Sequence, residues 1–169
     1  MKHNFQSGFT LIELLLYVAI VSFLLVSVVS FYGLVVDSRI KNQSIAEVNV
    51  QGQQAMDIIS QTIRNASSIT APATGSSGTS ATIVVPTGSL SPTTFSLNGS
   101  VLQITQGANS PVALTSSRVL ISSLAFTNLS RSGTNGIIRV SFAVSNSNQA
   151  GLALHNYQKT FVSSAEIGW

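Results

Sequence analysis

The stretch that decides the fold is Gly8–Asp37, which reads GFTLIELLLYVAIVSFLLVSVVSFYGLVVD. Within it, residues 14–36 contain no charged residue, no proline and a single glycine, Gly33. A helix needs about 20 apolar residues to cross the hydrocarbon core of a bilayer, so this run is long enough. The sequence therefore predicts a membrane-spanning helix close to the N-terminus.

Two other interpretations of this run are weaker. A secretory signal peptide has a cationic start, an apolar stretch of only about 7–15 residues and a small-residue cleavage site. Here the leader has one charge, Lys2, the run is too long, and Val28-Val29-Ser30 fits the cleavage pattern poorly. A buried core helix would rarely be apolar on every side over such a length. Charge alone leaves the orientation open, because Lys2 precedes the run while Arg39 and Lys41 follow it.

Glu13 is the exception in this apolar segment. A carboxylate near the start of a spanning helix costs on the order of 2–3 kcal/mol on insertion scales, and less close to the interface. The spanning pattern by itself allows two interpretations: a carboxylate at headgroup depth in contact with water, or a functional group.

The residues around Glu13 resemble a known signal. Ser7-Gly8-Phe9-Thr10-Leu11-Ile12-Glu13-Leu14-Leu15 is similar to the class III signal of type IV pilins and pseudopilins. A short polar leader ends in Gly8, an aromatic residue follows, and Glu13 is the fifth residue beyond the glycine. The resemblance implies that a prepilin peptidase cuts between Gly8 and Phe9 on the cytoplasmic side and methylates the new amine of Phe9. It also implies a single-pass topology in the cytoplasmic (inner) membrane, with the N-terminus in the cytoplasm.

The same resemblance gives Glu13 a role and the chain a set of partners. It implies that Glu13 pairs with the Phe9 amine of a neighbouring subunit and sets the axial register of a filament. The partners it implies are the prepilin peptidase, other pilin or pseudopilin subunits, an inner-membrane assembly platform and the lipid bilayer. The expected product is a cell-surface filament or a type II secretion pseudopilus. The alternative is a membrane-anchored extracytoplasmic binding or adhesion module that does not polymerise.

Beyond Asp37 the helical pattern continues but becomes amphipathic. Apolar and small residues recur at three- and four-residue spacings between Ile45 and Ala66, with polar residues on the other faces. We expect this stripe, which includes Gly52, to pack on a C-terminal domain. No proline lies between Phe9 and Ala71, whereas many major pilins have one in this helix, and this favours a minor pilin or minor pseudopilin.

Residues 70–80, TAPATGSSGTS, are rich in turn-forming residues and predict a linker. After it the hydrophobic period becomes two, which is typical of strands. The expected strands are 81–86, 93–97, 100–105, 119–128, 137–144 and 152–161. The expected division is a cleaved leader (1–8), a transmembrane or filament-core helix (9–36), an amphipathic continuation (37–69), the linker (70–80) and a β-rich domain (81–169).

Asn98-Gly99 is the best short hairpin signal in the chain. A two-residue turn there would put Phe95, Leu97, Leu102 and Ile104 on one face. It would pair Leu97 with Ser100, Phe95 with Leu102 and Thr93 with Ile104.

These elements predict an α+β fold of type IV pilin-like layout, in which a long N-terminal helix packs on a C-terminal antiparallel β-sheet. The order of elements also resembles the larger minor pseudopilins, including the general-secretion J type. The family's frequent C-terminal cysteine pair is missing, because the 169-residue chain has no cysteine.

Composition excludes several other functions. Charged residues make up only 8% of the chain, and the net charge of +3 comes from eight basic and five acidic residues rather than from a basic patch. A nucleic-acid site is therefore not expected. His155 is the one histidine outside the leader, and no catalytic triad, metal cluster or phosphate loop can be assembled, so neither an enzyme nor a cofactor is expected. The Asn-x-Ser triplets at Asn65, Asn98 and Asn128 fit the glycan acceptor pattern weakly.

Overall fold

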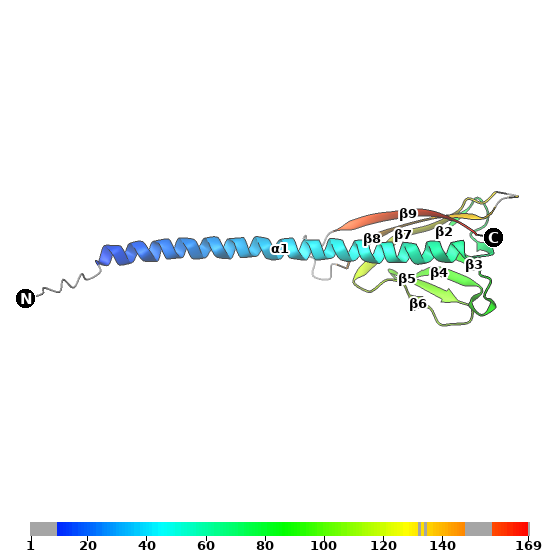
Figure 1. Ribbon diagram of the computed structural model, residues 1–169, viewed down its shortest axis with the longest axis horizontal. Coiled ribbons are helices and arrows are strands. Elements are labelled where there is room, and N and C mark those ends of the chain that lie inside the picture. The colour runs from blue at the N-terminus through cyan, green and yellow to red at the C-terminus, as the bar shows by residue number, and fades with distance from the viewer. Residues whose placement is uncertain (1–9, 132, 134, 148–156, 169) are drawn as a thin grey trace, which may run out of the picture. The chain divides into compact units, whose positions relative to one another are not determined.

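The computed structural model of the protein describes residues 10–131, 133, 135–147 and 157–168. Within these residues, one long helix, α1 (Leu11–Arg64), is followed by nine strands and a short 3-10 helix, η1 (Gly88–Leu90) (Figure 1). The chain divides into two compact units. The first ends at Ile40, and the second, from Lys41 onward, contains the rest of α1 and all the strands.

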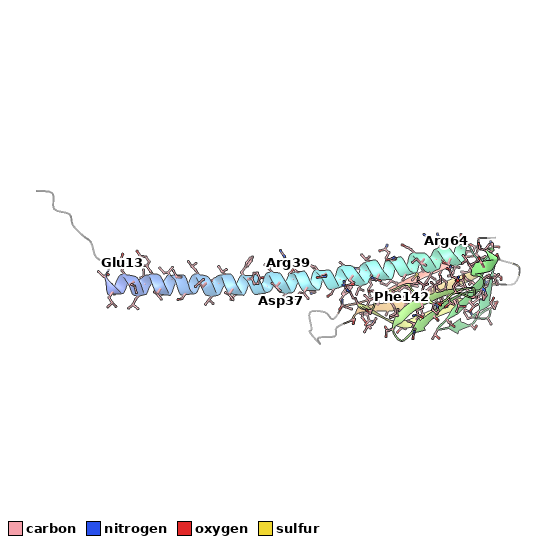
Figure 2. The ribbon with its side chains drawn as sticks, turned by 90° about the horizontal axis from the view of Figure 1, so that it is seen from below. Glu13, Asp37, Arg39, Arg64 and Phe142 are labelled. Atoms are coloured by element: carbon pink, nitrogen blue, oxygen red, sulfur yellow. The ribbon has the colours of Figure 1, made fainter. Side chains whose placement is uncertain are left out.

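In the first unit, α1 is apolar on every side and exposed on every side. None of its most apolar 18-residue window is buried. Figure 2 shows its side chains projecting all around the helix axis. By length and composition it is the one helix in the described residues that can cross a membrane.

In the second unit, α1 is amphipathic, as the sequence predicts. Its buried residues follow each other at spacings of mostly three or four, so they form one stripe along the helix. These residues are Ser44, Val48, Gly52, Ala55, Met56, Ile59, Ser60 and Ile63.

The strands form two antiparallel sheets rather than one. The first sheet has the order β1-β3-β4-β5-β6, and the second has the order β2-β7-β8-β9. The first contains β1 (Ser68–Ala71), β3 (Ala81–Val84), β4 (Thr93–Asn98), β5 (Val101–Gln106) and β6 (Val112–Ala113). The second contains β2 (Ser77–Gly78), β7 (Val119–Asn128), β8 (Ile137–Asn146) and β9 (Gln158–Glu166). A backbone hydrogen bond of 2.9 Å from Ile121 N to Ser100 O links the two sheets.

The helix stripe and the inner faces of both sheets share one core. Phe95, Phe126 and Phe142 are its largest fully buried side chains. The ring centroids of Phe95 and Phe126 lie 6.2 Å apart, and those of Phe142 and Phe161 lie 5.7 Å apart. These aromatic pairs join β4 to β7 and β8 to β9, so the core ties the two sheets together.

Gly52 makes the approach of β9 to the helix possible. A Cβ at this position would overlap the ring of Phe161. Beside it, Lys159 Nζ lies 5.1 Å from the centroid of the Phe161 ring and donates a hydrogen bond of 2.7 Å to Asn49 Oδ1. Glycine on the stripe is therefore a packing requirement for this helix–sheet contact.

The hairpin of β4 and β5 has the predicted face but not the predicted register. Asn98 pairs with Val101, so the turn residues are Gly99 and Ser100 instead of Asn98 and Gly99. Gly99 has φ +61°, and a positive φ at the first central residue is the pattern of a type II′ turn, which takes glycine there. The shift is two residues, an even number, so Phe95, Leu97, Leu102 and Ile104 still share one face.

Three expected boundaries need correction. Helix α1 ends at Arg64 rather than at 69, because Ser67 N already bonds to Val84 O at 2.7 Å and the chain enters β1. The stretch 70–80 is not a plain linker, since it contains the end of β1 and all of β2. Of the strand expected over 152–161, the part up to residue 156, with His155, lies outside the described residues, and β9 continues to Glu166.

Candidate functional site

The start of α1 is capped by Thr10. Thr10 Oγ1 accepts a hydrogen bond of 3.3 Å from the backbone N–H of Glu13, and Thr10 O accepts bonds of 3.1 and 3.2 Å from the N–H groups of Glu13 and Leu14. This is the N-cap half of a capping box, in which Ser or Thr is followed three residues later by Glu. Glu13 therefore sits in the first helical turn, where a negative charge is favourable for the helix dipole.

A second residue fixes the Glu13 carboxylate. Tyr17 lies one turn further on, and its Oη donates a hydrogen bond of 3.3 Å to Glu13 Oε1. Residues four apart lie on the same face of a helix, so the pairing follows from the spacing. A distance of 3.3 Å is long for an O–H···O bond, which leaves the carboxylate able to accept a stronger partner.

Two of the three predicted site residues, Gly8 and Phe9, lie outside the described residues. Glu13 is described and is partly exposed, on a segment whose apolar neighbours are exposed. Its local partners Thr10 and Tyr17 were not among the predicted site residues. The Thr-x-x-Glu spacing and the four-residue separation from Tyr17 are the signals that could have found them.

The described part of the β-rich unit was compared with the requirements of a metal site. No group of three or more His, Cys, Asp or Glu side chains that could hold a metal ion occurs among the described residues. Asn128, which the sequence places in a glycan acceptor pattern, is buried at the end of β7. Its Nδ2 donates to Pro72 O at 2.8 Å and its Oδ1 accepts from Ser130 N at 3.0 Å. It is a structural link between loops and not an exposed acceptor.

Comparison with known protein families gives a match at the N-terminus. Residues 3–29 match the family described as the prokaryotic N-terminal methylation motif. The chain carries a class III prepilin signal. No curated protein and no solved structure gives a significant match. The signal covers Gly8, Phe9 and Glu13, together with the two local partners of Glu13.

The class III signal and the apolar helix that follows it support a type IV pilin-like prepilin. The long helix on antiparallel sheets has the α+β layout of type IV pilins. Proteins of this kind are structural rather than enzymatic. The signal implies processing by a prepilin peptidase and assembly with other pilin subunits, and the helix suggests membrane anchoring.

Proposed function

We propose that the mature chain is a structural subunit of a type IV pilus-like filament or of a type II secretion pseudopilus. The observation that carries this proposal is the class III signal joined to a helix that is apolar and exposed on all sides. Such a helix cannot remain in water, so its natural surroundings are lipid before assembly and neighbouring helices after it. A permanently anchored binding module would need the lipid-spanning helix but not the signal.

The chemistry begins with cleavage of the Gly8–Phe9 peptide bond by the prepilin peptidase. The products are a leader of eight residues and a mature chain whose first residue is Phe9, which is then N-methylated. Removal of the leader also removes Lys2, so the side-chain charge falls from +3 to +2 (3 − 1). The new amine of Phe9 restores a positive charge close to Glu13.

Glu13 is proposed to set subunit register. An unpaired carboxylate in a core of packed apolar helices is costly, whereas one paired with an amine is much less so. The cap at Thr10 holds Glu13 in the first turn, and the long Tyr17 bond leaves its carboxylate able to accept the Phe9 amine of a neighbouring subunit. The apolar side chains supply cohesion without direction, and the ion pair supplies the axial position.

The topology follows from the cleavage. The peptidase acts on the cytoplasmic side, so the N-terminus is in the cytoplasm and the β-rich unit is outside the cytoplasmic membrane. The assembly platform in the inner membrane then moves the subunit into the filament. An unbroken α1 without proline supports a minor pilin or minor pseudopilin rather than a major subunit.

Mass spectrometry of the mature N-terminus tests the proposal. Phe9 as the first residue, carrying one added methyl group, is the expected result. Gly8→Val, which puts a branched side chain at the scissile bond, should leave the leader attached. An intact leader on the wild-type protein, or a mature start near Phe31, would refute the assignment.

A second experiment separates processing from assembly. Glu13→Val should leave cleavage at Phe9 largely intact but reduce incorporation into filaments, because the register pair is lost. Glu47→Val, which removes an acid from the second unit, is the matched control and should assemble normally. Normal filament incorporation of Glu13→Val would refute the register role, and processed wild-type chains that never enter a filament would favour the anchored module.

A further inference from the structure

Among the described residues, β9 is the longest edge strand of either sheet without a strand on its outer side. It pairs with β8 through nine consecutive residues without a register shift, and no strand follows it in the sheet order. Backbone hydrogen bonds from Ile167 N to Gly136 O (2.8 Å) and from Asn146 N to Tyr157 O (3.3 Å) show which residues of β9 direct their N–H and C=O groups toward β8. These are the odd-numbered residues, because hydrogen-bonded pairs alternate along an antiparallel ladder. The N–H and C=O groups of the even-numbered residues therefore point away from β8, at 158, 160, 162, 164 and 166.

This edge lacks two of the usual protections against strand addition, a proline and a bulge, although it carries the charged residues Lys159 and Glu166. Its middle residue, Val162, is 61% exposed. Within the described part of the chain, the backbone groups of the even-numbered residues in β9 have no hydrogen-bond partner. Just beyond the strand, Gly168 N–H points to the same side and donates to Arg64 O at 2.9 Å. An edge of this kind presents a row of N–H and C=O groups with which another chain can pair.

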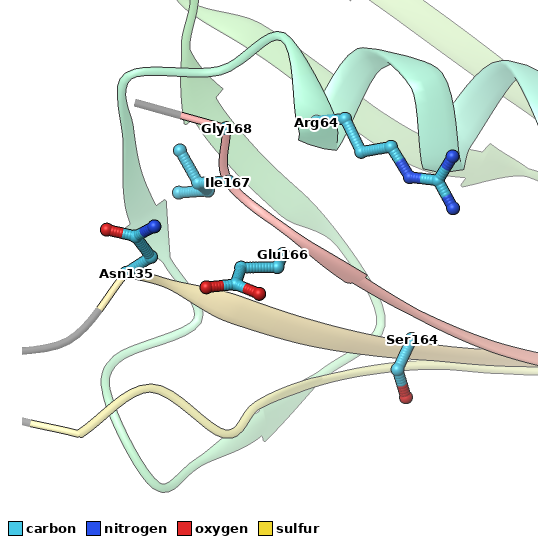
Figure 3. Close-up of a pocket in the computed structure, with 6 residues that line it drawn as sticks. All are labelled: Arg64, Asn135, Ser164, Glu166, Ile167 and Gly168. Carbon is cyan, nitrogen blue, oxygen red and sulfur yellow. The ribbon is translucent and has the colours of Figure 1, made fainter.

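A pocket of about 580 Å³ lies at the C-terminal end of this edge, and Arg64, Ser164 and Glu166 are among its lining residues. Figure 3 shows the end of β9 running between Arg64, on the last turn of α1, and Glu166 with Asn135 on the other side. Among the described residues, neither the Arg64 guanidinium nor the Glu166 carboxylate forms an ion pair. In a chain with 8% charged residues, two opposite charges that have no ion-pair partner among the described residues flank the same strand edge.

We infer that the β9 edge binds an extended segment of another protein as an added strand, with a basic and an acidic residue next to each other in that segment. Consecutive side chains of a strand point to opposite faces. A basic side chain on the outer face of the sheet would reach Glu166, and its acidic neighbour would reach Arg64 on the helix side. Main-chain hydrogen bonds would supply affinity and the two charges specificity. This inference goes beyond the proposed filament role and does not depend on it.

A second copy of this chain fits the edge less well. Antiparallel pairing of two β9 strands about Val162 would place Glu166 opposite Gln158, which leaves the carboxylate without a cation. Parallel pairing in register would place Glu166 beside Glu166 of the other copy, and like charges directly opposite each other are destabilising. The charges therefore favour a different polypeptide.

Binding of a defined peptide to the detergent-solubilised full chain tests the inference. The probe is acetyl-Thr-Val-Thr-Lys-Glu-Thr-Val-Thr-amide with a fluorophore, measured by anisotropy. The control peptide, acetyl-Thr-Val-Lys-Thr-Glu-Thr-Val-Thr-amide, has the same composition but puts both charges on one face. The first peptide should bind, and the second should bind about two- to fivefold more weakly, the value of one exposed charge pair.

Protein variants locate the site. Val162→Pro removes an outward N–H but none of the bonds to β8, so the fold should persist while peptide binding falls by at least about tenfold. Val162→Thr keeps the N–H and should bind as the wild type. Glu166→Gln and Arg64→Gln should each weaken binding about two- to fivefold. Near-ultraviolet circular dichroism and thermal unfolding of each variant check that the β-rich unit is intact.

Several outcomes would overturn the inference. No binding of the Lys-Glu peptide at millimolar concentration would do so, as would equal binding by the Val162→Pro and Val162→Thr variants. Analytical ultracentrifugation of the wild type and of Val162→Pro gives the oligomeric state of each. A wild-type chain that dimerises while Val162→Pro is monomeric would assign the edge to a second copy instead.

Discussion

The two halves of α1 have the same secondary structure and opposite relations between hydropathy and burial. Up to Ile40 the helix is almost entirely apolar and almost entirely exposed. From Lys41 onward it is largely polar, yet a stripe of it is fully buried against the sheets. The more apolar half of the helix is therefore the half with fewer packing contacts to other described residues.

This difference shows that the two halves of α1 are stabilised by different surroundings. The second half is stabilised by tertiary packing, as most helices in water are. The first half has no partner among the described residues, so lipid or other subunits must cover it. The same amino-acid change is therefore expected to have different consequences in the two halves, and matched substitutions can test this.

The largest expected effect comes from removing a buried ring. Phe142→Ala should lower the free energy of unfolding of the β-rich unit by about 3–5 kcal/mol, since the Phe142 ring on β8 is fully buried in the core. Phe23→Ala, at a ring that is 74% exposed, should change it by less than about 0.5 kcal/mol. Urea unfolding in detergent, followed by near-ultraviolet circular dichroism, measures both. Equal losses would contradict the division into two differently stabilised halves.

The next effect concerns the membrane. Val21 and Val50 are similarly exposed, at 53% and 63%. Val21→Arg should make membrane insertion less favourable by about 2.5–3.5 kcal/mol, because it places a charge in the apolar run. Val50→Arg should leave insertion unchanged. Extraction of cell membranes with alkaline carbonate gives the inserted fraction of each variant, and loss of insertion by Val50→Arg would show that the spanning segment is not the first half.

An effect of intermediate size is expected from substituting the glycines of α1, because Gly52 lies in the second half of the helix and Gly33 in the first. Gly52→Leu should destabilise the β-rich unit by about 1–3 kcal/mol, because the new side chain overlaps Phe161. Gly33 has open space around it, so Gly33→Leu should leave that unit unchanged and favour the helix by up to about 1 kcal/mol. Thermal unfolding of the two variants side by side makes the comparison. A tolerated Gly52→Leu would mean that the β9 contact is dispensable.

The smallest effect is expected at an acid of the second half. Glu47 Oε1 lies 3.8 Å from Arg118 Nη1, an ion pair close to the surface. Glu47→Gln should cost less than about 1 kcal/mol, and the cost should shrink at high salt. Urea unfolding at low and high ionic strength measures it. A loss of unfolding free energy above about 2 kcal/mol would show that Glu47 has a role that the ion pair does not explain. Glu13, in the first half of the helix, is expected to matter for filament assembly and not for the stability of the β-rich unit.

Much of the β-rich unit could be predicted from alternation alone. Strand β7 has the predicted bounds, and the face shared by Phe95 and Leu102 is correct. The hairpin register could not be predicted, because two adjacent turn choices at Asn98-Gly99-Ser100 preserve the same face. The two-residue strands β2 and β6 have too few residues for a period. At the candidate site, Glu13 was predicted, while Thr10 and Tyr17 were missed although their spacing was visible.

The sequence by itself determined the prepilin signal, the apolar helix and the shortage of charge. These depend on neighbouring residues and on transfer from water, which each segment carries wherever it lies. Only the tertiary structure decided that there are two sheets, that the absence of a side chain at Gly52 makes room for Phe161, and that Asn128 is buried. It also decided that, in the described part of the chain, no strand pairs with the outer edge of β9 beside Arg64 and Glu166. Those features depend on which distant segments pair and in which register, and residues far apart in the chain acquire that relation only when the core forms.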